Sequence, residues 1–225
     1  MKQIFLIGDS IRYGVSHPER HEDTGYGVFI KEKLKGKANV LAPNENCRFT
    51  HYTLRYLHQW AKETGAGENV DLVCWNNGLW DVLRMYGDEP FTPIEQYGEM
   101  LRRIYRRIRV LFPRAKVVFF FSTPVEEALA PKGELVRYDE DVVAYNQKAV
   151  EVLSPLGVEL LDLYTKAKTL QPTYSRDWMH FTPKGAEQLA DFIIDSLGLS
   201  ELPIEDEETQ QVDFNRNSTY EGETI

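Results

Sequence analysis

Short apolar runs alternate with helical stretches along this sequence. The first run is Ile4-Phe5-Leu6-Ile7, and the most strongly apolar one extends from Lys116 to Phe121. Such runs are too short for core helices and are typical of strands buried on both faces of a parallel sheet. Their alternation with helices predicts a three-layer α/β/α sandwich. The expected strands are 4–7, 39–42, 70–75, 116–121 and 158–163, and the expected helices are 27–35, 50–64, 94–112, 139–153 and 183–197.

The size and charge of the chain limit what it can bind. It has 225 residues, enough for one sizeable core, and its 26 basic and 35 acidic residues give a formal net charge of −9. This balance argues against binding to nucleic acid or to an anionic membrane surface. The arginines between Arg102 and Arg109 have helical spacing, which is typical of a solvated helix face. We therefore expect a small-molecule substrate and neither a nucleic-acid nor a membrane partner.

Cysteine usage and a change in composition predict a compartment and a domain boundary. Cys47 and Cys74 do not make a disulfide framework, and neither a secretory signal nor a membrane-length apolar run is visible, so a cytoplasmic location is expected. Residues 200–225 are acidic and polar, which predicts an α/β domain over 1–199 followed by an extended tail. Val212 and Phe214 are the apolar residues that could anchor this tail. The oligomeric state is left open.

A serine follows the first apolar run directly, in the sequence Gly8-Asp9-Ser10. Ligands of open parallel sheets bind at the carboxyl ends of the strands, so Ser10 is well placed to be a nucleophile. The alternative is an ordinary turn, because all three residues are good turn formers. The nucleophile interpretation needs a base, a group that orients this base, and donors for the oxyanion.

One of the five His residues has a suitable partner. His180 lies three residues after Asp177 and just before the last expected helix, whose first residue is Pro183. This spacing predicts an acid–base pair on one turn, with the carboxylate orienting the imidazole toward Ser10. The alternative is an ordinary histidine in a helix-entry loop.

The other histidines have simpler explanations. His17 and His21 lie in a polar loop close to Glu22 and Asp23, without a recognised metal-ligand spacing. A solvated loop is the expected structure there. We predict neither a metal nor an organic cofactor.

These motifs together resemble those of the SGNH (GDSL-type) hydrolase superfamily, over about residues 2–197. Gly8-Asp9-Ser10 matches its first block, and Asp177-Trp178-Met179-His180 matches its last. The resemblance implies a flavodoxin-like parallel sheet of strand order 2-1-3-4-5. It also implies that Ser10 is the nucleophile, that His180 is the general base, and that Asp177 orients this base. The backbone N–H of Ser10 would be one oxyanion donor.

The sequence departs from the common family pattern at the two other oxyanion donors. Cys47 aligns with a glycine that donates its backbone N–H, and any residue except proline retains that donor. Asn77 is the expected amide donor, with Asn76 second, although Asn76-Asn77-Gly78 is also a common turn sequence. Cys47 lies beside Arg48, which raises the alternative of a low-pKa thiolate nucleophile.

The resulting hypothesis is a serine esterase that removes a small acyl group, such as O-acetyl on a carbohydrate. Asn76, Trp80 and Trp178 are the expected substrate-binding residues, and Trp75 and Met179 would complete a compact apolar pocket. An acyltransferase or thioesterase with the same triad is one alternative. A non-catalytic binding domain that retains the fold is another, favoured by the two altered donor positions. A flavodoxin-like cofactor or receiver domain is disfavoured, because no glycine-rich phosphate loop follows the first strand.

Overall fold

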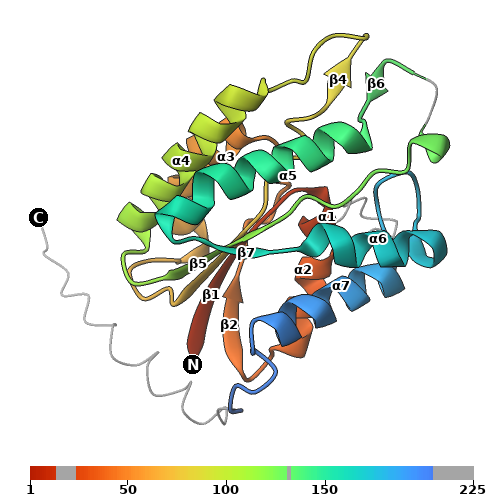
Figure 1. The fold of residues 1–225 in the computed structure, drawn as a ribbon. Coiled ribbons are helices and arrows are strands. Elements are labelled where there is room, and N and C mark those ends of the chain that lie inside the picture. Colours follow the sequence, from red (N-terminus) through yellow and green to blue (C-terminus); the bar gives the residue numbers. More distant parts are fainter. Residues whose placement is uncertain (14–23, 131–132, 205–225) are drawn as a thin grey trace, which may run out of the picture.

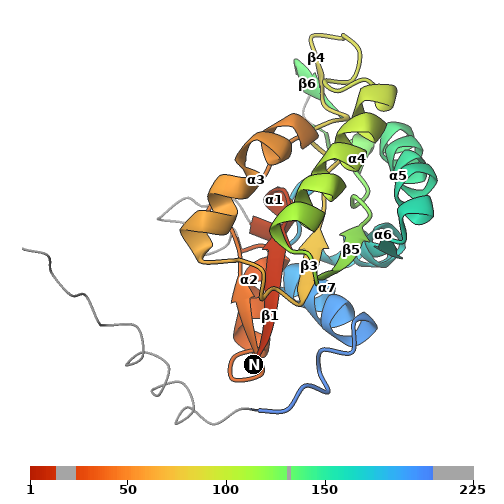
Figure 2. The same ribbon diagram turned by 90° about the vertical axis from the view of Figure 1, so that its left-hand side faces the viewer.

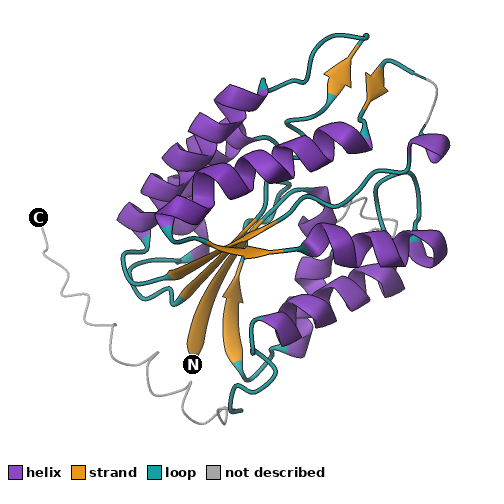
Figure 3. Cartoon of the chain, in the orientation of Figure 1, coloured by secondary structure: helices purple, strands orange, loops and turns teal. Residues whose placement is uncertain are grey.

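The computed structural model describes residues 1–13, 24–130 and 133–204. In this part of the chain a central parallel sheet lies between two layers of helices (Figures 1 and 3). The predicted α/β/α sandwich is therefore confirmed. The loop histidines His17 and His21, with Glu22 and Asp23, lie outside the described residues, as do Val212 and Phe214 of the tail. The domain boundary near residue 199 stays a prediction.

The sheet has the strand order β2-β1-β3-β5-β7, and all four neighbouring pairs are parallel. This is the order 2-1-3-4-5 that the resemblance implies, counted over the strands of this sheet. The second strand of this order, β1, pairs with β2 on one side and with β3 on the other, where Ile7 is opposite Trp75. The strands are β1 Lys2–Ile7, β2 Ala38–Leu41, β3 Leu72–Trp75, β5 Lys116–Phe120 and β7 Glu159–Leu161.

Three helices cover each face of the sheet, and Figure 2 shows the two layers from the side. One layer contains α3 (Thr50–Thr64), α4 (Ile94–Leu111) and α5 (Asp139–Leu153). The other contains α2 (Tyr26–Lys33), α6 (Leu163–Tyr174) and α7 (Pro183–Ser196). A short helix α1, Ser10–Tyr13, directly follows β1.

The core lies between the sheet and these layers, and large aromatic residues fill much of it. The ring of Phe5 in β1 packs against Phe112 at the end of α4, with 5.2 Å between ring centroids. Trp75 and Phe119 meet edge to face, 5.0 Å apart. All four side chains are fully buried. Because successive residues of β1, β3 and β5 are buried, these strands contact both helical layers, as their apolar runs predict.

The structure has a helix that the sequence patterns did not predict. Helix α6 occupies residues expected to be part of the loop before Asp177. Asp162 caps it, since its carboxylate accepts hydrogen bonds from the backbone N–H and the hydroxyl of Thr165 (2.9 and 2.7 Å). Pro172 in its last turn and its many polar residues obscure the helical signal. Thr50, expected to cap α3, is instead the first residue of that helix, and Phe49 is at the cap position.

A small second sheet joins two connections at the carboxyl end of the main sheet. Strand β4 (Arg84–Met85) pairs antiparallel with β6 (Leu135–Val136), so that Arg84 is opposite Val136. Short 3₁₀ helices cover Glu127–Leu129 and Ser154–Leu156. The segment expected to be a loop or lid is therefore paired with the loop that follows β3. No helix among the described residues has the length and apolarity that a membrane crossing requires.

Candidate active site

Ser10 stands where β1 ends and α1 begins. Asp9 caps this short helix, because its Oδ1 accepts the backbone N–H of Ile11 at 3.0 Å. Within the described residues, the backbone N–H of Ser10 makes no hydrogen bond. Its hydroxyl is largely buried, with 8% of the residue exposed.

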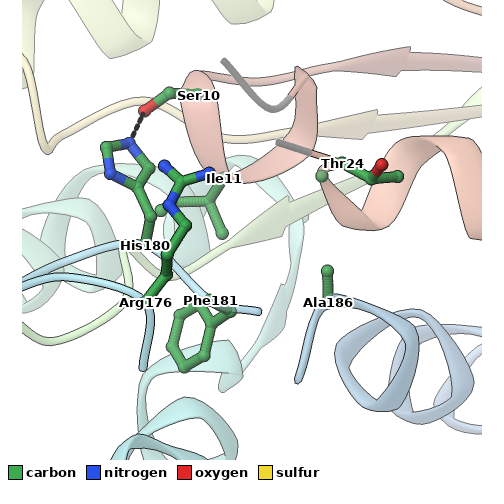
Figure 4. A pocket seen from close by; sticks show the side chains of 8 residues that line it. Ser10, Ile11, Thr24, Arg176, His180, Phe181 and Ala186 are labelled. Atoms are coloured by element: carbon green, nitrogen blue, oxygen red, sulfur yellow. Dashed lines mark hydrogen bonds between the residues drawn. The ribbon is translucent and has the colours of Figure 1, made fainter. Parts of the chain in front are cut away.

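The structure brings Ser10, His180 and Asp177 together in one hydrogen-bonded chain. Nε2 of His180 lies 2.9 Å from Oγ of Ser10 (Figure 4). Nδ1 of the same ring lies 2.9 Å from Oδ2 and 3.1 Å from Oδ1 of Asp177. The imidazole is thus held by the carboxylate on one side and meets the serine hydroxyl on the other. This is the geometry in which a serine loses its proton to a histidine.

Asp177 is a strong acceptor because several donors converge on it. Oδ1 accepts the backbone N–H groups of Met179 (2.9 Å) and His180 (2.8 Å), in addition to the imidazole. Burial raises the pKa of the Asp177 carboxyl, but these hydrogen bonds and the attraction of His180 outweigh burial and lower its pKa below the ordinary value. The group is therefore ionised at neutral pH and is suited to stabilise an imidazolium.

The loop that carries Asp177 and His180 is fixed by backbone hydrogen bonds at several points. The N–H of Arg176 donates to the carbonyl of His180 (2.8 Å), and the N–H of Glu126 donates to the carbonyl of Trp178 (2.7 Å). Thr182 then caps α7 by accepting the N–H of Gly185 (3.3 Å). These contacts hold the base on a rigid turn.

The environment of Cys47 fits neither of its two predicted roles, backbone donor to the oxyanion or thiolate nucleophile. Its backbone N–H donates to the carbonyl of Gly8 (3.1 Å) and is therefore already used. Its side chain is fully buried, and burial raises the pKa of the thiol, with the cation of Arg12 acting in the opposite direction. The alternative of a low-pKa thiolate activated by Arg48 is thus wrong for this structure.

Arg12 fastens the Cys47 loop to the end of β1. Its terminal nitrogens donate to the carbonyl oxygens of Pro43 (3.0 Å) and Glu45 (2.5 Å), and one of them lies 3.6 Å from Sγ of Cys47. The guanidinium is almost completely buried. No sequence pattern indicates this role, because a single arginine beside the serine motif is not part of a characteristic motif.

Asn77, the expected amide donor, holds the loop after β3. Its Nδ2 donates to the carbonyl of Arg48 (2.8 Å) and to the hydroxyl of Thr53 (3.0 Å), and its Oδ1 accepts the indole N–H of Trp75 (2.7 Å). Both amide protons are used and the side chain is fully buried, so Asn77 has no proton left for an oxyanion. The expectation for Asn77 therefore requires correction.

Asn76 has one hydrogen bond from its amide nitrogen, to the carbonyl of Phe120 (3.0 Å). It is nearly buried, and its backbone N–H donates to the carbonyl of Ile7. Gly78 follows with φ of +152°, and a Cβ there would come within 2.2 Å of Oγ of Ser122. The turn after β3 runs from Gly78 to Asp81, whose N–H donates to the Gly78 carbonyl (2.8 Å), and Asn76 and Asn77 precede it.

Asp81 fixes the loop after β3 to the start of helix α3. Its carboxylate accepts the hydroxyl of Thr50 (2.7 Å) and the backbone N–H of the same residue (3.1 Å). The group is fully buried, and burial raises its pKa to about 6 although the hydrogen bonds of Thr50 oppose this shift. Asp81 thereby connects the third-block loop to the start of α3.

The tryptophans expected in a substrate pocket separate into two groups. Trp75 is completely buried in the core. Trp80 and Trp178 both contact the Arg137 guanidinium, whose central carbon is 5.7 and 5.5 Å from the two ring centroids. Arg137 was not predicted as a site residue.

A pocket adjoins Ser10 on the side of helices α2 and α7 (Figure 4). Its shape is set by the turn after β1, by the start of α2 and by the histidine loop. The guanidinium of Arg176 lies near His180 in this pocket, and one of its nitrogens is 3.4 Å from Oδ2 of Asp177. The lining residues are Ser10, Ile11, Thr24, Gly25, Arg176, His180, Phe181 and Ala186.

The fold and the hydrogen-bonded Ser, His and Asp define the class of serine hydrolases. The family model of GDSL-like lipases and acylhydrolases matches residues 6–188, and the chain belongs to this family. The resemblance seen in the sequence is therefore confirmed.

Known proteins similar to this chain come from plants and bacteria. GDSL esterase/lipase CPRD49 of Arabidopsis thaliana is 22% identical over 203 residues, which cover 85% of this chain and 77% of the plant protein. The crystal structure of a lipase/acylhydrolase from Enterococcus faecalis has a TM-score of 0.68 at 19% identity, over 92% of this chain and 100% of the other. The acetylxylan esterase Axe2 of Geobacillus stearothermophilus has a TM-score of 0.63 at 16% identity, over 88% and 94% of the two chains. At these identities the structural likeness is one of fold.

Proposed function

We propose that this protein hydrolyses a carboxylic ester with Ser10 as nucleophile, His180 as general base and Asp177 as the group that orients and stabilises the base. The observation that carries the proposal is the continuous chain of hydrogen bonds from Asp177 through His180 to Ser10, with contacts of 2.9 Å on both sides of the imidazole. A hydroxyl is a weak nucleophile, and a histidine at this distance is what activates it.

In the first half of the reaction Oγ of Ser10 attacks the ester carbonyl while its proton passes to Nε2 of His180. The tetrahedral intermediate then collapses, the bond to the alcohol breaks, and the imidazolium returns the proton to the leaving oxygen. In the second half a water molecule loses a proton to His180 and attacks the acyl-enzyme. The carboxylic acid leaves, and Ser10 regains its proton. Asp177 remains ionised throughout.

The oxyanion of each intermediate needs donors that are in place beforehand. The backbone N–H of Ser10 is the first, since it makes no hydrogen bond within the described residues and stands at the start of a helix. Asn76 is the second candidate, because its amide nitrogen donates one hydrogen bond among the described residues, to the carbonyl of Phe120, and so retains one proton. Cys47 and Asn77 are not assigned this role.

The substrate that we propose carries a small acyl group, with O-acetyl on a carbohydrate as the first choice. Two observations support this choice. The pocket beside Ser10 is lined by the apolar side chains of Ile11, Phe181 and Ala186, which suit a short acyl chain. The similar fold of Axe2, which is named as an acetylxylan esterase, shows an architecture on which such a substrate is handled.

The experiment that tests the nucleophile is labelling with a fluorophosphonate probe, which reacts with activated serines. Wild type should be labelled in proportion to enzyme, while Ser10→Ala should not be labelled and His180→Ala should be labelled far more slowly. Hydrolysis of p-nitrophenyl acetate should follow the same order. Label retained in Ser10→Ala would overturn the assignment. Equal hydrolysis by wild type and His180→Ala would favour a non-catalytic binding domain.

An acyltransferase or a thioesterase would use the same three residues. Product analysis with an acetyl ester, with and without an added alcohol or CoA acceptor, separates these activities. We expect free acetate as the product in both conditions. Transfer to the acceptor as the main product would replace the hydrolase proposal with the transferase.

A further inference from the structure

Arg137 is a buried cation beside two indole rings at the carboxyl end of the sheet. Only 7% of the residue is exposed, whereas its neighbours Leu135 and Tyr138 are exposed. The central carbon of its guanidinium lies over the rings of Trp80 and Trp178, 5.7 and 5.5 Å from their centroids. Cation–π contacts of this kind stabilise the group and restrict its movement, and they leave the N–H groups free to donate.

Among the described residues this cation forms no salt bridge, although the charge of the buried Asp9 attracts it. Nε donates to the carbonyl of Leu79, and the two terminal nitrogens make no hydrogen bond. A small part of the residue is exposed, and the terminal nitrogens are the donors left for a ligand. Arg84 on the facing strand provides a contrast, because it forms a two-point ion pair with Asp141 at 2.9 and 3.0 Å.

Holding an unpaired charge in this position has a free-energy cost. Burial lowers the pKa of Arg137 to about 10, against the attraction of Asp9, which acts in the opposite direction. A buried ion whose terminal N–H groups have no acceptor is uncommon unless a ligand supplies one. Perturbed titratable groups of this kind concentrate at functional sites.

The contacts of Arg137 place it at the candidate active site. Trp178 is in the same turn as His180, and its carbonyl helps to hold that turn. Leu79 and Trp80 belong to the loop after β3, which Asn77 anchors beside the Cys47 loop. The pairing of β4 with β6 delivers Arg137 to this point from a distant part of the chain.

We propose that Arg137 is a carboxylate-recognition residue, and that the substrate is an acidic ester whose carboxylate binds the exposed edge of this guanidinium. The proposal rests on the esterase activity proposed above and specifies its substrate class. A planar guanidinium matches a carboxylate with two parallel hydrogen bonds, and the flanking indoles fix it in advance. The carboxylate can belong to the acyl part of the ester or to its alcohol part.

Two matched pairs of esters distinguish these sources. For the acyl part, the mono-p-nitrophenyl ester of succinic acid is compared with p-nitrophenyl butyrate. For the alcohol part, p-acetoxybenzoate is compared with its methyl ester. The quantity measured is the ratio of kcat/KM for the acidic ester to kcat/KM for its neutral match, in wild type and in Arg137→Gln.

We expect wild type to favour the acidic member of one pair, and Arg137→Gln to lower that ratio about 10- to 100-fold, mainly through KM, as the loss of a charge-assisted pair predicts. Arg137→Lys should retain part of the preference. Arg84→Gln is the matched control, since it removes an arginine of the same small sheet that already has a partner, and its ratios should equal those of wild type. The pair that responds identifies the part of the substrate that carries the carboxylate.

Two results would overturn the proposal. Ratios unchanged in Arg137→Gln would show that the guanidinium does not bind the carboxylate. An equal loss of kcat on all four esters would show that Arg137 acts on the oxyanion or on packing instead.

If wild type hydrolyses none of the esters, the proposed function fails, and calorimetric titration with the stable amide p-acetamidobenzoate tests Arg137 alone. Weaker binding to Arg137→Gln than to wild type then supports carboxylate recognition, and equal binding contradicts it.

Discussion

The side chain of Arg12 lies directly against Gly8, so that a Cβ built on the glycine would be 2.8 Å from Cβ of the arginine. The same arginine fastens the loop of Pro43 and Glu45 to the end of β1. Packing therefore requires glycine at this position of the serine motif, because any side chain there would clash with the buried side chain of Arg12.

Gly8→Ala should consequently disturb both the fold and the serine. Relief of the contact requires a shift of Arg12 or of the backbone that positions Ser10, and we expect a loss of about 1–3 kcal/mol in the free energy of unfolding. Activity on p-nitrophenyl acetate should fall as well. Gly67→Ala is the control, because a Cβ at Gly67 has no atom within 4 Å. Urea unfolding of the two variants tests the prediction, and equal stability would contradict it.

Asp177→Asn should separate structure from catalysis. Asparagine retains an oxygen for the N–H groups of Met179 and His180, but it loses the carboxylate that faces Nδ1 of the imidazole. We expect kcat to fall roughly 10²–10⁴-fold while KM changes little, because the charge that stabilises the imidazolium is gone. Steady-state kinetics measure both constants. A kcat within a few-fold of wild type would remove Asp177 from the mechanism.

The same variant should change the response to acid. The pKa of Asp177 is lowered in the folded protein, so its carboxylate stabilises the fold above the ordinary pKa of about 4, and this contribution disappears at lower pH. Wild type should therefore lose stability relative to Asp177→Asn as the pH falls below about 4. Thermal unfolding at several acidic pH values provides the comparison. If the melting temperatures of wild type and Asp177→Asn differ by a constant amount down to low pH, the pKa of Asp177 is not lowered in the folded state.

Cys47→Ala should leave catalysis in place. The thiol is buried and its pKa is raised, so it is neither a nucleophile nor open to reagents. We expect kcat within a few-fold of wild type and a loss of about 1 kcal/mol in stability from the missing contact with Arg12. In the native wild type, Ellman's reagent should react with neither Cys47 nor Cys74, which is also buried. Rapid labelling of one thiol would contradict its burial. Loss of activity in Cys47→Ala together with retained activity in Ser10→Ala would make Cys47 the nucleophile in place of Ser10.

Asp81 should make the protein less stable as the pH rises from about 4 to 7. Its pKa of about 6 in the folded protein exceeds its ordinary value of 3.8, so the folded state binds the proton more tightly than the unfolded state does. The protonated Asp81 therefore stabilises the fold at low pH. This contribution to the free energy of unfolding, at most about 3 kcal/mol, is lost as the pH rises through the pKa of the folded protein.

Urea unfolding of wild type and Asp81→Asn between pH 4 and 7 measures this effect, because the other groups are common to both proteins. The stability of wild type should decline relative to the variant over this interval. Asp195→Asn, an exposed position on α7, is the control and should follow wild type. A constant difference between wild type and Asp81→Asn would contradict the prediction.

The parts of the structure that could be predicted are those that local patterns determine. Strands β1, β3 and β5 are buried on both faces, so their apolar runs were visible, and the strand order followed from the family resemblance. Ser10, Asp177 and His180 stand at positions where one short motif marks each of them. The helix α6 was missed because Pro172 and its polar residues mask the spacing of Leu163, Ala167 and Leu170.

The remaining features depend on contacts between distant segments. Asn76 and Asn77 are adjacent, and the sequence does not indicate which amide turns toward Thr53 in α3. Arg137 is an ordinary arginine in a polar stretch until β4 and β6 pair and place it between Trp80 and Trp178. No local signal marks a position whose environment is created by tertiary pairing.

The residues that make up the proposed proton path stand 170 positions apart, because Ser10 follows the first strand and His180 precedes the last helix. Ser10 lies in the first half of the chain and His180 in the second. Strand β1 must therefore pair with β2 and β3 before Ser10 and His180 can meet. Such a long-range topology folds slowly compared with helical bundles of similar size. Return of activity after denaturation should therefore lag behind the return of helical circular dichroism, which makes catalysis a built-in reporter of completed folding.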